Sequence, residues 1–107
     1  MAALLPVRGR VYAADIGFGR KPWLVVSNNH RNRAFDDCLA VRLTTTPRQT
    51  RSTIVPLGPA DSPLVGRVMC DDITLLYRED LLEDLGAVSF ATMTLVAGGL
   101  RAALDLQ

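Results

Sequence analysis

The amino-acid sequence predicts a mainly β fold (α+β), a small antiparallel β-barrel or sandwich that is followed by a C-terminal α-helix. Three observations support this prediction. The 107 residues suit a single domain that spans positions 1–107. Apolar residues recur with a period near two over the first two-thirds of the chain, in short runs that glycine and proline interrupt. Near the C-terminus the apolar spacing changes to that of an amphipathic helix.

Five short strands are expected, each bounded by glycine, proline or polar residues. The second is a continuous apolar run, which is typical of a strand that is covered on both faces. We expect Pro22 to be its first residue, because proline has no amide hydrogen to donate. The expected strands are Arg10–Ile16, Pro22–Ser27, Cys38–Thr45, Thr53–Leu57 and Gly66–Cys70.

The third of these strands alternates between two faces, because successive side chains of a strand point to opposite sides of the sheet. A polar, basic loop at 46–52 follows it. One face carries Cys38, Ala40, Arg42 and Thr44, and the other carries Leu39, Val41, Leu43 and Thr45.

The C-terminal segment is expected to be a helix from Phe90 to about Leu104, with Ser89 as its N-cap. The pair Gly98-Gly99 weakens this helix by roughly 1 kcal/mol per glycine, and it permits another backbone to approach closely. A tight helix–sheet contact or a dimer contact is therefore expected there. The apolar stripe consists of Met93, Val96, Leu100 and Leu104.

Composition and motifs exclude several classes of protein. No apolar run approaches the roughly 18 residues that span a bilayer, and nothing resembles a signal peptide, so we expect a soluble cytoplasmic protein. P-loop, GxGxxG, HExxH and GxSxG motifs are absent. With His30 as its one histidine, the chain predicts neither a metal site nor a cofactor. The cysteines, Cys38 and Cys70, lie 32 positions apart and are expected to be small core residues.

The net charge of +1 hides an asymmetry between the two halves of the chain. Residues 1–51 hold nine cations and three acids, and residues 52–107 hold three cations and eight acids. Such a division favours a basic face for an anionic partner, nucleic acid included. The alternative is that folding mixes the two halves into an even surface.

Cations and amides surround the second strand. A glycine-rich turn places Arg20 and Lys21 directly before it. If this turn folds over the end of the third strand, the two cations meet the hydroxyl of Thr44. A cation and a hydroxyl suit the cleavage of RNA by its own 2′-hydroxyl, because the substrate supplies the nucleophile. The protein has only to neutralise charge on the phosphorus centre and to move two protons.

Five segments in register give the chain a resemblance to the MazF/PemK (Kid) family of toxins, from about Arg8 to Leu106. The resemblance implies a small SH3-like barrel with a C-terminal helix, assembled as a homodimer. It implies a sequence-specific, metal-independent endoribonuclease that acts on single-stranded RNA. It also implies an antitoxin partner whose acidic C-terminal segment covers the RNA site. The segments are RGRVYAADIG, KPWLVVSNNHRN, AVRLTTT, GRVMCDDITLL and LGAVSFATMTLVAGGLRAAL.

The resemblance also implies which residues are catalytic. The family's cation before the proline of the second strand corresponds to Lys21, and its threonine at the end of the third strand corresponds to Thr44. The first loop is shorter than in the commonest pattern, which has arginine before the proline, so Arg20, Lys21 or both carry the role. Arginine clamps an oxyanion but hardly donates a proton, whereas a desolvated lysine does both. Asp71 matches an acidic position that positions or deprotonates in some relatives; the alternative is a turn formed with Asp72.

Further residues are candidates for contact with RNA along one groove, which a second subunit is expected to complete. Asparagines hydrogen-bond the edges of splayed bases, although they also stabilise turns. A tryptophan stacks on bases, although in an apolar strand it is more often core. Basic loop residues contact phosphates and add salt-dependent affinity. The candidates are Asn28, Asn29, His30, Arg31, Asn32, Arg42, Arg48, Arg51 and Trp23.

Three other functions remain open from the sequence. The same barrel serves in the related CcdB toxins to poison DNA gyrase, but this chain ends Leu104-Asp105-Leu106-Gln107 and lacks their aromatic–hydrophobic tail. A non-catalytic RNA-binding module would need the fold without a working Lys21–Thr44 pair. A structural oligomerisation domain would not explain why the cations are concentrated in one half of the chain.

Overall fold

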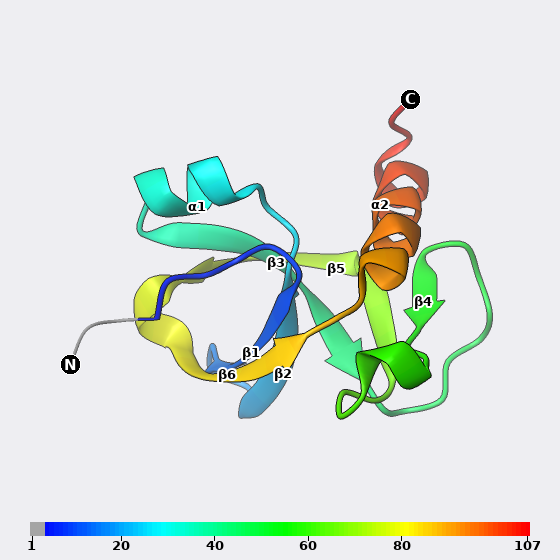
Figure 1. The fold of residues 1–107 in the computed structure, drawn as a ribbon, viewed down its shortest axis with the longest axis horizontal. Coiled ribbons are helices and arrows are strands. Elements are labelled where there is room, and N and C mark those ends of the chain that lie inside the picture. Colours follow the sequence, from blue (N-terminus) through cyan, green and yellow to red (C-terminus); the bar gives the residue numbers. More distant parts are fainter. Residues whose placement is uncertain (1–3) are drawn as a thin grey trace.

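A single antiparallel sheet forms the body of the protein in the computed structural model, which describes residues 4–107 (Figure 1). Within these residues the sheet has six strands in the order β4-β5-β3-β2-β1-β6. The predicted mainly β fold with a C-terminal helix is thus confirmed. The strands are β1 (Arg10–Asp15), β2 (Arg20–Val25), β3 (Asp37–Thr44), β4 (Ile54–Pro56), β5 (Arg67–Tyr77) and β6 (Leu81–Ala87).

The long helix α2 (Phe90–Leu104) packs against β4 and β5 at one side of the sheet (Figure 1). Its predicted N-cap is confirmed, because the Ser89 hydroxyl accepts a hydrogen bond from the Thr92 amide. A short helix, α1 (Asn29–Ala34), connects β2 to β3. Two 3₁₀ turns, η1 (Pro59–Asp61) and η2 (Arg78–Asp80), connect the later strands.

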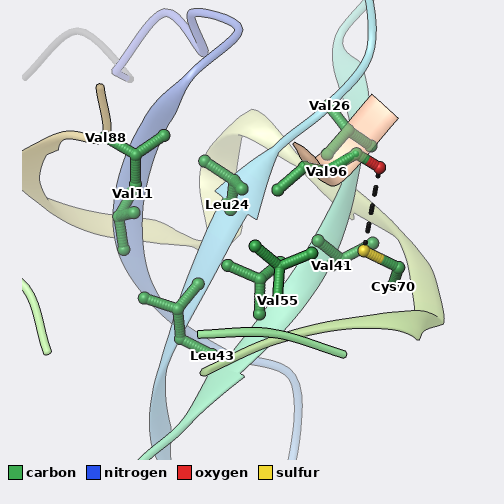
Figure 2. Packing of buried hydrophobic residues seen from close by; sticks show 10 residues of the cluster. Val11, Leu24, Val26, Val41, Leu43, Val55, Cys70, Val88 and Val96 are labelled. Atoms are coloured by element: carbon green, nitrogen blue, oxygen red, sulfur yellow. Dashed lines mark hydrogen bonds between the residues drawn. The ribbon is translucent and has the colours of Figure 1, made fainter. Parts of the chain in front are cut away.

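The first core cluster lies between the sheet and α2 (Figure 2). Val96 of α2 is fully buried in it, and the Cys70 thiol approaches the Val96 carbonyl oxygen at 3.8 Å. The close approach predicted at the glycine pair is confirmed at Gly99, where a Cβ atom would lie 2.7 Å from the Cys70 sulfur. The predicted apolar stripe is wrong at its end, because Leu104 is half exposed beyond the edge of this core. The cluster comprises Val11, Leu24, Val26, Val41, Leu43, Val55, Val68, Cys70, Val88 and Val96.

A second core cluster covers the opposite face of the same strands. Alternation distributes neighbouring residues between the clusters, so that Val41 belongs to the first and Ala40 to the second. The predicted faces of the third strand are therefore confirmed. The second cluster comprises Tyr12, Ala14, Trp23, Val25, Cys38, Ala40, Leu76 and Leu81.

Both cysteines are free and buried, as predicted. Burial raises the pKa of each thiol to about 11, so both remain protonated at neutral pH. Within residues 4–107, no helix has the length and apolar character that crossing a membrane requires.

Several predicted boundaries are wrong. The fifth strand was expected to end at Cys70, but β5 continues to Tyr77 through a register shift between Val41 and Arg42 of its partner β3. The acidic pair after Cys70 lies inside this irregularity and forms no turn. The edge strand β6 was missed altogether. Pro22 was expected to begin its strand, whereas β2 begins two residues earlier, at Arg20.

Candidate active site

The candidate site lies where β2 and β3 separate. Their pairing ends at Trp23 opposite Arg42. Continuing the same register would place Pro22 opposite Leu43 and Lys21 opposite Thr44. Val26 donates its amide hydrogen to Leu39 of β3, so by the two-residue alternation the backbone of Pro22 also faces β3. Because proline has no N–H to donate, the ladder stops there and the two strands diverge.

A pocket of about 340 Å³, here called the phosphate pocket, opens between the diverging strands. Arg20, Lys21 and Thr44 all line it. The structure therefore brings together the two cations and the hydroxyl group that we expected from the sequence to meet. The remaining lining residues are Pro22, Arg42, Leu43, Thr45, Thr46 and Val65.

The Thr44 side chain is held in a defined position. It is 7% exposed, and its hydroxyl oxygen accepts a hydrogen bond from the Thr46 amide at 3.1 Å. The hydroxyl hydrogen is then free to be donated to a ligand oxygen. Gly66 packs directly behind, at a φ of +111°, and a Cβ atom there would lie 2.5 Å from the Thr44 carbonyl oxygen. Only glycine fits this approach, so Gly66 fixes the backbone that carries Thr44.

The two catalytic cation candidates differ in their partners. Arg20 forms an ion pair with Glu83 of the edge strand β6, and both side chains are exposed. Lys21 forms no ion pair with any carboxylate of residues 4–107, and neither does Arg42. Lys21 is therefore the cation with fewer competitors for a bound phosphate.

Folding partly mixes the charge of the two halves of the chain. Cations of the first half pair with acids of the second in Arg10–Asp84, Arg20–Glu83 and Arg51–Asp71. The predicted basic face is therefore smaller than the sequence suggested. Lys21 and Arg42, which line the phosphate pocket, are among the first-half cations that form no ion pair within residues 4–107.

The acidic pair on β5 divides between two surroundings. Asp71 accepts a hydrogen bond from the Thr53 hydroxyl at 2.5 Å and lies 3.7 Å from the Arg51 guanidinium. It does not line the phosphate pocket, so the geometry gives no support to its predicted catalytic role. Asp72 instead lines an adjoining pocket together with Lys21 and Arg42. The sequence analysis did not select Asp72. The two neighbouring carboxylates reach different surroundings only because the backbone of β5 is irregular there, and residue types do not reveal this irregularity.

The segment after β2 is a capped helix, where the sequence suggested a loop. Asn28 accepts a hydrogen bond from the Arg31 amide as its N-cap, and Asn29 accepts one from the Arg8 amide at 2.7 Å. Arg31 contacts Asp37 at 2.6 Å and lies over the Phe35 ring. Each of these side chains therefore has a structural role, whereas His30 is exposed.

Asn32 requires a correction. Its side chain is fully buried, donating to the Ser27 carbonyl at 2.9 Å and accepting from the Ser27 hydroxyl at 2.6 Å. A buried, hydrogen-bonded amide does not reach an RNA base, so Asn32 is part of the protein core. An Asn of this kind is indistinguishable in sequence from its exposed neighbours.

The remaining RNA-contact candidates are dispersed. The Trp23 ring is buried in the second core cluster, with an edge against the pocket that Asp72 lines. Arg48 is exposed on its loop, and Arg51 lies near β4 and α2 instead of the phosphate pocket. Helix α1 follows the end of β2 that is opposite Lys21, and the strand from Lys21 to Val25 alone spans about 13 Å at roughly 3.3 Å per residue. An RNA that contacts both ends must therefore follow the whole strand.

Several neighbours of the site carry no signal in the sequence. Arg67 of β5 pairs with Thr44 in the sheet register, which puts both side chains on one face. Phe18, at the tip of the β1–β2 loop, is 80% exposed beside the pocket. Within residues 4–107, no group of three or more His, Cys, Asp or Glu side chains is arranged to hold a metal ion.

The arrangement suits binding and stabilisation of a phosphate that gains negative charge. Comparison with known proteins identifies the family: residues 7–104 match the PemK-like, MazF-like toxins of type II toxin–antitoxin systems. The chain belongs to this family. The family predicted from sequence is thereby confirmed.

Two relatives have the same extent as this chain. Endoribonuclease MazF1 of Mycobacterium bovis and endoribonuclease MazF4 of Mycobacterium tuberculosis are each 52% identical over 101 residues, which is 94% of this chain and 94% of each relative. The expected class of enzyme, an endoribonuclease, is the class to which these relatives belong.

Solved structures show the same fold. A mycobacterial endoribonuclease in complex with its cognate antitoxin is 51% identical and superposes with a TM-score of 0.90, covering 95% of this chain and 97% of that one. The MazE–MazF complex of Deinococcus radiodurans has a TM-score of 0.83 at 22% identity, over 97% of this chain and 99% of that one. The second likeness concerns the fold alone.

Proposed function

We propose that this toxin is a sequence-specific endoribonuclease that cuts single-stranded RNA in the cytoplasm and so inhibits translation and growth. The observation that supports this most directly is the placement of Lys21 and Thr44 on two sides of one cationic pocket, in a chain whose relatives are endoribonucleases. The scissile phosphate is proposed to bind in the phosphate pocket.

The proposed reaction uses the RNA's own nucleophile. The 2′-hydroxyl oxygen attacks the adjacent phosphorus and releases its proton to the solvent. The bond from phosphorus to the 5′-oxygen breaks, and that oxygen gains a proton. The products are a 2′,3′-cyclic phosphate and a 5′-hydroxyl, and the atom balance requires neither water nor a metal ion in this step.

Each pocket residue has a role in this scheme. Lys21, which lines the pocket, neutralises the charge that develops on the phosphorus centre and protonates the leaving oxygen. Thr44 donates its free hydroxyl hydrogen to a non-bridging phosphate oxygen. Arg20 acts as a second clamp once a phosphate competes with Glu83 for its guanidinium.

The proposal extends to partners. An antitoxin with an acidic C-terminal segment would inhibit the enzyme by presenting carboxylates to Lys21 and Arg42, which have no carboxylate partner among residues 4–107. A homodimer would complete the RNA groove. The complex of the mycobacterial relative with its cognate antitoxin supports the first of these partners.

The decisive experiment is incubation of the purified toxin, free of antitoxin, with a long single-stranded RNA in EDTA, followed by mapping of the new ends. We expect discrete cuts at a recurring short sequence, with cyclic phosphate and 5′-hydroxyl ends. A Lys21→Gln variant, which lacks the proposed catalytic cation, should lose this cleavage. Its matched control is Arg33→Gln, which removes an exposed cation at the far end of β3 and should cut normally. Intact RNA with a folded toxin would contradict the proposal and leave gyrase poisoning or RNA binding without cleavage as the alternatives.

A further inference from the structure

A second pocket adjoins the phosphate pocket and is not used by the reaction described above. We call it the aromatic pocket; its volume is about 220 Å³. Lys21 and Arg42 line both pockets, so the two cavities share a wall. A nucleotide with its phosphate in the first pocket therefore has its base within reach of the second. The other lining residues are Ile16, Phe18, Gly19, Trp23, Asp72 and Thr74.

Phe18 is exposed but its loop is well defined. The side chain is 80% exposed, which is unusual for an aromatic residue that has no partner. The Asp15 carboxylate accepts hydrogen bonds from the Gly17 amide at 2.9 Å and the Gly19 amide at 3.2 Å, on either side of Phe18. The loop thus presents an aromatic ring at the mouth of the pocket without support from the core.

The indole of Trp23 contributes a donor without an acceptor. Trp23 is 4% exposed and lines the pocket, and its Nε1 atom is buried with no hydrogen-bond partner among residues 4–107. A buried N–H that lacks an acceptor is costly, by about 1–3 kcal/mol, unless a ligand or water supplies one. Trp23 thus brings an unsatisfied donor to the set of residues that line the pocket.

Asp72 contributes acceptors in the same cavity. Its carboxylate forms no ion pair with a cation of residues 4–107, although Lys21 and Arg42 line the same pocket. Its one hydrogen bond within these residues is a long one, 3.4 Å from the Thr74 hydroxyl. Most of the acceptor capacity of this carboxylate therefore remains for a ligand.

We propose that the aromatic pocket binds a guanine base of the RNA, next to the scissile phosphate. This inference rests on the proposed nuclease function and deepens it by naming one recognised base. Phe18 stacks on the base, Asp72 accepts hydrogen bonds from its N1–H and N2–H groups, and Trp23 Nε1 or Lys21 donates to its O6 atom.

Guanine is favoured because it presents two adjacent donors and one acceptor on the edge that would face Asp72. A carboxylate accepts both donors at once, in the bidentate manner of carboxylate–guanidinium pairs. Adenine and cytosine present one amino group beside an acceptor that would repel the carboxylate, and uracil presents a single N–H between two acceptors. The donors supplied by Lys21 and Trp23 complement the O6 atom of guanine.

The test measures binding without cleavage. RNA pentamers with 2′-O-methyl groups lack the nucleophile, and the single tryptophan of the chain, Trp23, reports binding through its fluorescence. Pentauridylate carrying guanine at its centre should bind at least about tenfold more tightly than the same pentamer with adenine, cytosine or uracil there. The pentamer with inosine, which lacks the N2 amino group, should bind about threefold to tenfold more weakly than the pentamer with guanine.

Variants sharpen this test. Asp72→Asn should abolish the preference for guanine over adenine, because an amide offers one donor and one acceptor. Phe18→Ala should weaken binding of the guanine pentamer about tenfold, and Phe18→Tyr should bind this pentamer as tightly as the unaltered protein does. Asp36→Asn is the matched control, because Asp36 is an exposed acid beside the other end of β3 and should leave the preference unchanged.

Two results would overturn the proposal: equal affinity for all four bases, or Trp23 emission that does not respond to the guanine pentamer. The failure of the nuclease proposal is seen separately, in the RNA digestion in EDTA. A toxin that cuts RNA at sites with no recurring guanine keeps its proposed function and loses the aromatic pocket as a guanine site.

Discussion

The two ends of β3 are built from the same kinds of residue, yet they differ in how those residues are satisfied. At the start of the strand, Arg31 contacts Asp37, and the buried Asn32 exchanges hydrogen bonds with Ser27. At its end, Lys21 and Arg42 have no carboxylate partner within residues 4–107. The comparison teaches that a cation or an amide is a candidate for contact with RNA only where the fold itself does not use it.

The largest effect is expected at the end of β3 that borders the phosphate pocket, here called the open end. The start of β3, beside Arg31 and Asn32, is called the closed end. Lys21→Ala and Thr44→Ala should each lower turnover about a hundredfold, a barrier increase of roughly 2.7 kcal/mol, because each removes a group that is proposed to contact the phosphate in the transition state. Thermal unfolding should change little in Lys21→Ala, whereas Thr44→Ala also loses the hydrogen bond from the Thr46 amide and should cost about 1 kcal/mol of stability without unfolding the protein. Turnover is measured on a short RNA that contains one cleavage site. Normal cleavage by both variants would show that the open end is not the active site.

The closed end should respond in the opposite way. Asn32→Ala leaves the Ser27 carbonyl oxygen without its side-chain donor and removes the hydrogen bond that the Ser27 hydroxyl donates to Asn32, so the free energy of unfolding should fall by about 2 kcal/mol. Turnover per folded molecule should stay unchanged. Urea denaturation and the RNA assay together make this measurement. A loss of turnover at full stability would return Asn32 to the RNA-binding residues.

The pH dependence of stability tests a contact that holds the segment before Gly66, next to the open end. Asp61 is fully buried and joins the segment before Gly66 to α2, accepting hydrogen bonds from the Ser89 amide, the Gly58 amide and the Thr92 hydroxyl. Burial alone would raise the pKa of this carboxyl, but these hydrogen bonds prevail and hold the pKa below its ordinary value of 3.8.

A depressed carboxyl pKa contributes stability that is complete above the unfolded-state pKa and is lost as the pH falls through the folded-state pKa. The unfolding free energy should therefore decline below about pH 4. In Asp61→Asn this part of the decline should be absent, and stability at neutral pH should be lower by about 1–3 kcal/mol. Urea titrations between pH 2 and 7 compare the two proteins. Parallel pH profiles would show that Asp61 does not stabilise this segment.

The smallest effect concerns the cation that has an ion-pair partner. Glu83→Gln frees the Arg20 guanidinium, and because the pair is exposed, stability should change by less than about 1 kcal/mol. Affinity for RNA should rise a few-fold at low salt if Arg20 is a clamp. Filter binding at two ionic strengths makes the measurement, with Asp84→Asn as the control because Asp84 pairs with Arg10 instead. Unchanged affinity would leave Lys21 as the principal cation.

Local signals were sufficient for much of the fold. Ser89 marked the beginning of α2 correctly, and the alternation of Cys38–Thr45 gave the correct faces of β3, because caps and two-residue periodicity act over a few residues. Edge strand β6 was missed because most of its side chains are exposed and its alternation is weak. Helix α1 was missed because six polar or small residues carry no apolar stripe.

The candidate site was predictable only in part. The sequence analysis expected Lys21 to meet Thr44 if the glycine-rich turn folds over the end of the third strand, and the antiparallel pairing of β2 with β3 brings this about. The division of labour between Asp71 and Asp72 depends on a backbone irregularity, and the burial of Asn32 depends on Ser27 five residues earlier. Such contacts depend on tertiary packing, for which residue type is not informative.

The proline of β2 has a consequence for protein engineering. A missing amide hydrogen at Pro22 accounts for the end of the β2–β3 ladder, beside which the phosphate pocket opens. Replacing Pro22 with valine would supply that hydrogen and favour continued pairing with Leu43. Such a variant would keep every charged side chain of the toxin while narrowing its cleft. It offers a charge-matched, inactive version of the protein, which alanine scanning of the cations does not provide.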